Sequence, residues 1–296
     1  IDKLARGEKE MVLSSGWAGS QLLNSDDYRA YVGGTTGLIY GFVNDGFYTV
    51  DDFKPFDSKS RTWTLKDGVV NSSPLSGDPR PGNAKFKKLT PVDENSANPY
   101  TLTDDDRTVI GNTTPKFSGG FGLNATFKGF DVSAFFNFMY DFDVFNANKV
   151  MMTTWASNNY NNFSMDISAA KRWRNFDDMG NEIRYSPEIL AEFNKNATMW
   201  NPTSIGRPIA MSYAVEDGSF LRLNTATIGY TLPRAWTNKV GLSRVRFYAS
   251  GYNLFTITGY SGYDPEVDIA TGLTPNIDNN RYPRSRTYTF GVQLTF

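Results

Sequence analysis

Two alternating arms joined by a two-residue turn are the feature of this sequence that most restricts its fold. They lie in the stretch PKFSGGFGLNATFKGFDVSAFFNFMYD, between Pro115 and Asp141. Lys128 and Gly129 suit a tight hairpin turn, because glycine readily adopts positive φ. Apolar or small residues on one face are Phe117, Gly119, Phe121, Leu123, Ala125 and Phe127, then Phe130, Val132, Ala134, Phe136, Phe138 and Tyr140. The pattern predicts an antiparallel hairpin.

The length and the second face of this hairpin indicate its surroundings. A two-residue turn places Phe127 opposite Phe130, so both arms contribute to one apolar face. The other face of the second arm is polar, except for Phe135 and Met139. Arms of about eleven residues can cross a membrane as tilted strands, whereas soluble sandwiches use strands of about five or six. The pattern therefore favours a barrel with lipid outside and a wet lumen over a soluble sandwich.

Composition excludes several classes of function. The chain has no Cys and no His, which excludes disulfides, thiolate metal sites and histidine-based catalysis. Its 30 basic and 31 acidic residues leave a net charge of −1, so charge gives no argument for a nucleic-acid partner. The sequence contains no run of about 18 apolar residues, which a membrane-spanning helix would need.

Other segments also read as strands. Candidates are Met11–Trp17, Leu38–Val50, Phe220–Tyr230, Val245–Phe255 and Tyr288–Phe296. Within Phe220–Leu232 the apolar residues change parity, which predicts a β-bulge near Asn224–Thr227. Pro187–Asn196 has helical spacing and predicts one short helix in a long loop.

Four stretches carry a family resemblance. The first three are Gly37–Phe53, Leu102–Phe136 and VEDGSFLRLNTATIGYTLP at Val215–Pro233. The fourth is Val245–Val267, followed by Arg281–Phe296. In this order the stretches resemble the C-terminal barrel portion of SusC/RagA-type TonB-dependent outer-membrane transporters of Bacteroidetes.

The resemblance implies an all-β fold, an antiparallel transmembrane β-barrel of which this chain is about the C-terminal third. We expect 22 strands in the whole barrel. Residues 1–296 are expected to form part of this barrel, to have long extracellular loops and to contain no plug domain. The implied location is the bacterial outer membrane. Expected partners are the plug and N-terminal strands of the same transporter, a SusD-like lipoprotein, TonB through the N-terminal part, and lipid. We expect the chain to be a piece of a longer protein.

The implied function is import of nutrient oligomers, with oligosaccharides as the first expectation and oligopeptides as the second, and no enzymatic activity. A passive porin-like channel and a secreted all-β binding module remain as alternatives. No nucleic-acid partner and no cofactor are expected, although calcium in the extracellular loops or in the lipoprotein is an alternative. The acidic stretch Val92–Arg107 lacks the usual calcium-loop pattern. Its Asp104, Asp105 and Asp106 could share a cation, but a solvated run of charge is favoured.

Three groups of residues are candidate functional sites. Trp155, Asn158, Asn159 and Tyr160 combine aromatic planes with amides, which suits a ligand-facing loop. In the long Gly259–Arg286 connection, Tyr260, Tyr263 and Tyr282 are candidates for the interface with the lipoprotein, because tyrosine is enriched at protein interfaces. By the resemblance, the last strand also contains the signal for outer-membrane assembly, with Phe290, Val292, Leu294 and Phe296 as its residues.

Overall fold

The chain forms two compact units in the computed structural model, which describes residues 4, 7–17, 26–154, 162–267 and 272–296. The loop unit consists of Ile1–Thr113, Phe145–Val215 and Ala270–Asn279. The sheet unit consists of Thr114–Val144, Glu216–Ile269 and Asn280–Phe296. Each unit is described by itself.

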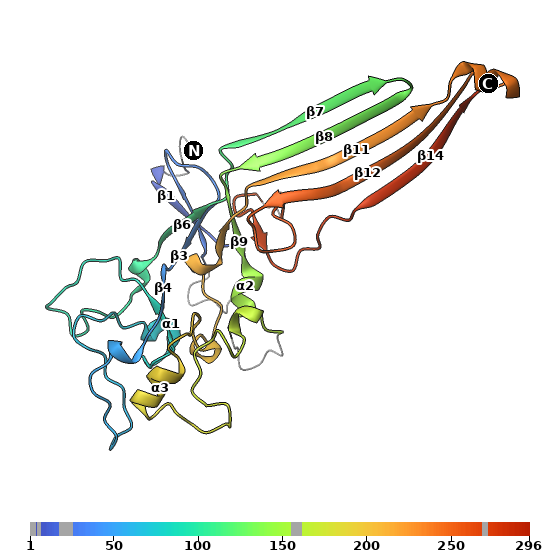
Figure 1. Ribbon diagram of the computed structural model, residues 1–296. Helices are drawn as coiled ribbons and strands as arrows, with labels where there is room; N and C mark the ends of the chain where they lie inside the picture. Colours follow the sequence, from blue (N-terminus) through green and yellow to red (C-terminus); the bar gives the residue numbers. More distant parts are fainter. Residues whose placement is uncertain (1–3, 5–6, 18–25, 155–161, 268–271) are drawn as a thin grey trace. The chain divides into compact units, whose positions relative to one another are not determined.

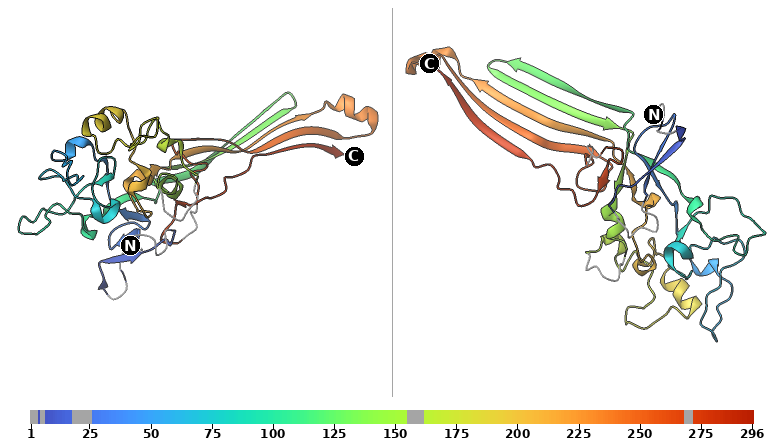
Figure 2. Two further views of the ribbon diagram at one scale, coloured as in Figure 1. Left: turned by 90° about the horizontal axis from the view of Figure 1, so that it is seen from below. Right: turned by 180° about the vertical axis from the view of Figure 1, so that it is seen from behind.

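The sheet unit contains five long antiparallel strands in the order β14-β12-β11-β8-β7, which lie side by side in Figures 1 and 2. Their bounds are β7 Phe117–Phe127, β8 Phe130–Tyr140, β11 Phe220–Thr231, β12 Arg244–Thr258 and β14 Thr287–Thr295. An eleven-residue strand extends about 37 Å, more than the roughly 30 Å of a bilayer's hydrocarbon core. The connection between β11 and β12 contains α4 (Arg234–Thr237) and η8 (Asn238–Val240).

The predicted hairpin of β7 and β8 is confirmed. Phe127 pairs with Phe130, and the register continues without a shift to the pair of Phe117 and Tyr140. Lys128 has φ 47° and Gly129 has φ 88°. Positive φ at both turn residues is the requirement of a type I′ turn, whose twist matches that of the strands.

The predicted irregularity in β11 is also confirmed. Its register against β8 shifts between Leu223 and Thr225, which inserts one extra residue, Asn224, on β11. A one-residue insertion changes the parity of all later side chains. The shift therefore brings Leu223 and Ile228, of opposite parity in sequence, to the same face of the sheet.

The loop unit has short strands and long irregular connections. One antiparallel sheet has the order β1-β2-β3-β6, a second pairs β4 with β5, and β13 pairs in parallel with the end of β9. The strand bounds are β1 Glu10–Leu13, β2 Tyr28–Tyr31, β3 Leu38–Gly41, β4 Asn44–Phe47, β5 Ala84–Phe86, β6 Thr108–Asn112 and β13 Ile277–Asp278. The strands β9 (Asp143–Asn146) and β10 (Val215–Asp217) lie where the chain passes from one unit to the other.

The helices in the described part of the loop unit are all short. They are α1 Ser73–Ser76, α2 Ala147–Met151, α3 Pro187–Phe193, η3 Val50–Asp52, η4 Asp104–Asp106, η5 Met165–Ile167, η6 Pro202–Ser204 and η7 Ser212–Ala214. The helix predicted from Pro187 is therefore confirmed as α3, with proline in its first turn. Among the described residues, no helix is long and apolar enough to cross a membrane.

The core of the loop unit is rich in aromatic side chains. Trp200, Tyr28, Phe86 and Phe145 are almost fully buried in one cluster with Ile39. Because so few residues lie in regular elements, side chains also satisfy backbone groups. The Tyr28 hydroxyl, for example, donates a 2.6 Å hydrogen bond to the Pro275 carbonyl.

Two predicted strands have different bounds in the structure. The segment Leu38–Val50 is broken into β3 and β4, because Phe42 leaves the first sheet and bridges to Met211 in parallel. The segment Met11–Trp17 is a strand only to Leu13. There the backbone of Ser15 turns to donate a 2.7 Å hydrogen bond to the Asp27 carboxylate.

Candidate functional site

The sheet unit presents one continuous apolar face across all five strands. Near the hairpin turn, one row crosses the sheet through Phe127, Phe130, Tyr230, Phe247 and Val292. The next row adds Val132, Ile228 and Phe290. All of these but Tyr230 are more than a third exposed in the chain by itself. Such a large exposed apolar surface requires an apolar environment.

The opposite face is polar near the hairpin turn. Arg246 on β12 reaches across Gly229 to Asp131 on β8, with a 2.9 Å bond from Nε and a second, shorter bond from its terminal nitrogen. Thr227 and Ser250 share a hydrogen bond of 2.8 Å between their hydroxyls. A sheet with one apolar and one hydrogen-bonding face matches the wall of a water-filled barrel.

The DGSFLR motif, Asp217–Arg222, connects the sheet to the last loop. Gly218 donates its N–H to the Phe142 carbonyl at 2.8 Å, and a Cβ at Gly218 would lie 2.6 Å from the Phe142 ring. Only glycine fits this close approach without displacing the ring. The next residue but one, Phe220, is buried against Phe142 and Tyr260.

Arg222, the arginine of this motif, is the centre of a buried ion cluster. Its side chain is 2% exposed and forms an ion pair with Asp264, and one of its nitrogens lies 3.7 Å from Glu266. Arg284 approaches Glu266 from the other side at 2.7 Å. Because Asp264, Glu266 and Arg284 all belong to the last loop, the cluster fastens both ends of that loop to β11.

The three tyrosines predicted at the lipoprotein interface differ in exposure. Tyr260 is 6% exposed and packs against Phe142, Phe220 and Val267. Tyr263 and Tyr282 are 88% and 92% exposed. Tyr260 therefore supports the loop from within, and the two exposed tyrosines are the side chains that it presents.

The other predicted site residues are distributed as follows. Trp155, Asn158, Asn159 and Tyr160 lie outside the described residues. On the last strand, Phe290, Val292 and Leu294 are 81%, 55% and 50% exposed on the apolar face, and the final Phe296 is 89% exposed. Their role in assembly stays a prediction.

The interpretation of Asp104–Asp106 as a solvated charge run is wrong for Asp106. Its side chain is fully buried and accepts hydrogen bonds from the backbone N–H groups of Leu89, Thr90 and Thr103 at 2.8–2.9 Å. Burial alone would raise the pKa of this carboxyl, but the hydrogen bonds outweigh burial and lower it to about 2. Asp104 pairs with Arg107 at 2.8 Å. No group of three or more acidic residues suited to a metal occurs in the described part of the chain.

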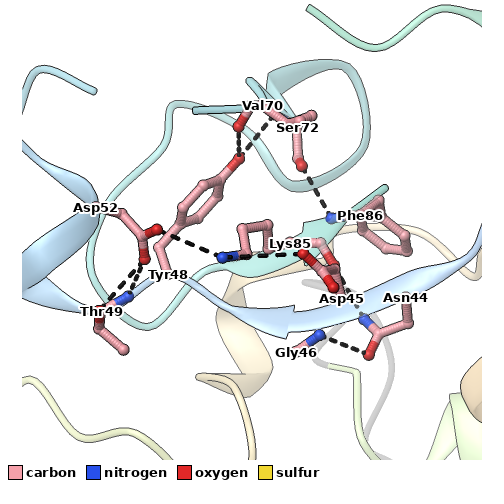
Figure 3. A network of polar contacts seen from close by, with 10 residues as sticks. All are labelled: Asn44, Asp45, Gly46, Tyr48, Thr49, Asp52, Val70, Ser72, Lys85 and Phe86. Carbon is pink, nitrogen blue, oxygen red and sulfur yellow. Dashed lines mark hydrogen bonds and ion pairs between the residues drawn. The ribbon is translucent and has the colours of Figure 1, made fainter. Parts of the chain in front are cut away.

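A polar network fixes β4 and the segment beside β5 in the loop unit (Figure 3). The buried Tyr48 hydroxyl donates to the Val70 carbonyl at 2.5 Å and accepts from the Ser72 N–H at 2.9 Å. Lys85 lies 3.4 Å from Asp52 and 3.9 Å from Asp45. Burial raises the pKa of Tyr48 further above its ordinary value, and the protonated hydroxyl serves as a donor.

This network borders a polar cavity of about 500 Å³ that sequence reasoning missed. The backbone of Tyr48 pairs with Asn83 at 2.9 Å and with Gly82 at 2.7 Å, which fixes one wall. The lining side chains with charge or an aromatic ring are Arg61, Trp63, Asp78, Arg80, Arg184 and Tyr185. They come from three separate segments of the chain, and no sequence motif joins them.

Comparison with known proteins shows which proteins the chain resembles. No family model matches it. TonB-dependent receptor P3 of Formosa agariphila is 30% identical over 270 residues, which are 89% of this chain and 22% of the relative. TonB-dependent receptor SusC of Bacteroides thetaiotaomicron is 32% identical over 164 residues, 51% of this chain and 15% of the relative.

The solved structures agree on the fold. The RagAB peptide importer in its open-open state matches with a TM-score of 0.62 at 22% identity, over 100% of this chain and 25% of the solved one. Its closed-closed state matches with a TM-score of 0.61 at 21% identity, over 99% of this chain and 25% of that one. The chain matches the SusC/RagA type of TonB-dependent receptor.

As a SusC/RagA-type chain, it has the antiparallel barrel fold of these receptors and its place is the bacterial outer membrane. The sheet unit supplies five antiparallel strands of such a barrel, with the apolar face toward lipid. The chain spans about a quarter or less of the length of the relatives and structures that it matches.

Proposed function

We propose that this chain supplies part of the membrane wall and the outward loops of a TonB-dependent importer. The observation that carries the proposal is the apolar face, continuous across five antiparallel strands of 9 to 15 residues. Strands of this length cross a bilayer when tilted. The relatives named TonB-dependent receptors support energy-coupled import, and the receptor names give no reason to expect catalysis.

The outer edges of the sheet unit belong to the proposal. Among the described strands, β7 pairs only with β8, and β14 pairs only with β12. Unpaired backbone groups are not tolerated in lipid, so a barrel must supply a strand to each edge. We propose that other strands of the same receptor pair with β7 and β14, and that its plug and TonB-contacting part belong to that receptor too.

Cargo and partner are the finer parts of the proposal. We propose oligosaccharides as the first class of cargo and oligopeptides as the second, for which the name of the RagAB peptide importer gives support. A SusD-like lipoprotein is the proposed partner. The exposed Tyr263 and Tyr282, on a loop fastened by Arg222, support the last loop as part of that interface.

The test is uptake in the host. The complete receptor gene is deleted and restored, and accumulation of labelled oligosaccharides and oligopeptides is measured with and without a protonophore. We expect deletion to abolish uptake of one oligomer class, and the protonophore to stop the uptake that restoration recovers. Unchanged uptake of both classes in the deletion strain would contradict the proposal. Restored uptake that resists the protonophore would favour the passive channel instead.

A further inference from the structure

The cavity in the loop unit has an unusual balance of charge. Among the described residues, its lining includes three arginines, Arg61, Arg80 and Arg184, but only one carboxylate, that of Asp78. Arg184 already pairs with Glu182. Within the described part of the chain, the guanidinium groups of Arg61 and Arg80 have no hydrogen bond or ion pair with a protein group. The cavity therefore offers two uncommitted cations to whatever enters it.

Flat rings lie beside these cations. Arg61 stacks on Tyr185, with its guanidinium carbon 5.3 Å from the ring centroid. Phe56 packs against both Tyr185 and Trp63, at centroid distances of 6.1 and 4.8 Å. Trp63 and Tyr185 line the cavity, whereas Phe56 contacts both rings without lining it. Aromatic faces bind the apolar face of a sugar ring or of a peptide side chain, and do not neutralise an arginine.

The geometry around Arg61 is fixed by local structure. Arg61 has φ 55°, a conformation that costs free energy in residues other than glycine and that is maintained by its surroundings. Asp57 and Thr62 exchange two backbone hydrogen bonds of 3.3 Å across this turn. The Asp57 carboxylate also accepts the Lys59 N–H at 2.9 Å and the Ser60 hydroxyl at 2.7 Å. The turn thus fixes the backbone from which the Arg61 side chain extends.

The segment that contains Arg80 is fixed as well. The Asn83 side-chain amide donates to the carbonyls of Ser76 and Asp78, both at 3.0 Å, which closes the segment that contains Arg80. Asn201 donates its N–H to the Gly82 carbonyl at 2.8 Å. A preformed cavity of this size lies within the usual range for small-molecule sites, roughly 300–1,000 Å³.

We propose that this cavity binds a carboxylate-bearing unit of an oligomer. Arg61 and Arg80 hold the carboxylate, and Trp63 and Tyr185 contact the flat side of the unit. Arginine pairs well with carboxylates because its N–H groups match their geometry. A uronic acid in an oligosaccharide and a peptide carboxylate share this chemistry. The proposal rests on the proposed import function only in treating the bound oligomer as cargo.

The experiment measures equilibrium binding to the complete receptor, purified from the host outer membrane in detergent. Four fluorescent probes are compared by anisotropy. They are tetragalacturonate, its methyl ester, a tetrapeptide with a free C-terminal carboxylate, and the same peptide amidated. We expect one carboxylate probe to bind at least about tenfold more tightly than its neutral counterpart. Which of the two binds distinguishes the uronic acid from the peptide.

Variants locate the binding in the cavity. Arg61→Gln and Arg80→Gln should each weaken binding of the carboxylate probe about tenfold and leave the neutral probe unchanged. Lys59→Gln is the matched control, because Lys59 is an exposed cation on the same turn but does not line the cavity. It should bind as the unmodified receptor does.

Three results would overturn the proposal. They are equal binding of charged and neutral probes, an equal loss in Lys59→Gln and Arg61→Gln, and no binding of either carboxylate probe up to about 1 mM. The comparison of probes uses the unmodified receptor, so it tests the preference for carboxylates even if a variant fails to fold. Since binding needs no TonB, binding without uptake would reject the import function alone, and uptake without binding would reject this site alone.

Discussion

At the scale of single residues, Arg222 illustrates how a buried charge depends on its partners. Removing it leaves the Asp264 side chain, which is only 10% exposed, without its ion-pair partner, and leaves Glu266, 11% exposed, with Arg284 alone. Breaking a buried pair in this way costs about 3–5 kcal/mol. We expect Arg222→Ala to release the last loop, and trypsin cleavage at Arg281, Arg284 or Arg286 of the folded receptor to become at least tenfold faster.

Arg284→Gln is the control in the same cluster. The Arg284 side chain is 46% exposed, and a pair of that exposure contributes about 0–1 kcal/mol. Its effect on cleavage at the remaining sites should be small. Equal cleavage of Arg222→Ala and the unmodified receptor would show that the cluster does not fasten the loop.

Asp106 gives a residue-scale prediction about pH. Its folded-state pKa of about 2 lies below the ordinary 3.8. Ionised Asp106 therefore stabilises the fold above about pH 4, by about 2 kcal/mol, and this contribution is lost as the pH falls from about 4 to about 2. Asp106→Asn should lower the thermal midpoint at pH 7 and reduce its dependence on pH between 4 and 2.

The neighbouring Asp105 is the matched control, because it is exposed. Asp105→Asn should keep both the midpoint and its acid dependence. A variant Asp106→Asn with an unchanged acid transition would contradict the role assigned to the buried carboxylate. Circular dichroism melts of the purified receptor at each pH supply the measurement.

Asp106 also shows what sequence reasoning could not predict at this scale. Asp104, Asp105 and Asp106 are identical in type and adjacent, yet only the third is buried. Leu89 and Thr90, whose backbone N–H groups donate to it, are 17 and 16 residues away in the sequence. Nothing in the sequence indicates that the two segments meet. The cavity was missed for the same reason, since Arg61, Arg80 and Tyr185 come from distant loops.

At the scale of elements, the sequence was most informative where side chains alternate. The hairpin of β7 and β8 and the bulge in β11 were both predicted, because a two-residue turn and a change of parity each impose a register. Leu38–Val50 was predicted as one strand but is two. There the break depends on Phe42 bridging to Met211, a long-range contact that alternation does not encode.

The bulge gives a prediction at this scale. Deleting Asn224 removes the extra residue and leaves Leu221 and Ile228 six positions apart, as far as their partners Phe138 and Val132 on β8, so a regular β11 keeps both on the apolar face. Inserting one alanine after Asn224 instead gives β11 two extra residues, and a one-residue bulge then turns the half that contains Ile228 to the polar face. We expect the insertion to lower the yield of heat-modifiable receptor in the outer membrane at least about tenfold, and the deletion to lower it much less. Inserting one alanine after Lys239, in the turn between β11 and β12, is the control and should also lower the yield much less. Equal yields of the two insertion variants would contradict the register.

The last strand gives a second element-scale prediction. β14 pairs with β12 from Thr287 to Thr295, and Phe296 lies just beyond this ladder. An open edge with an apolar face is a template for strand addition. If Phe296 is part of the assembly signal, its deletion should lower the amount of receptor in the outer membrane. Transport per assembled molecule, measured by uptake normalised to surface receptor, should stay the same. A normal yield would reject the signal.

At the scale of the whole molecule, the two units differ in their surfaces and in their packing. The sheet unit exposes an apolar face, and within the described strands its edges, β7 and β14, have unpaired backbone groups. Because unpaired backbone groups are not tolerated in lipid, further strands must complete a barrel. The loop unit has its own aromatic core and its own polar cavity. The chain thus combines a wall of strands with a separately packed loop unit, an arrangement that is common where a rigid scaffold positions functional segments.

The proposed lipoprotein partner is tested at this scale. Tyr263 and Tyr282 are large, nearly fully exposed side chains on a fastened loop, and aromatic anchors often dominate binding at protein interfaces. The double variant Tyr263→Ser with Tyr282→Ser should reduce the lipoprotein recovered with tagged receptor at least tenfold. Trp236→Ser is the control. Trp236 is 60% exposed but lies in α4, at the opposite end of β11 and β12 from that loop. Equal recovery with both variants would place the interface elsewhere, whereas a loss confined to the tyrosine variant would identify the last loop as the contact.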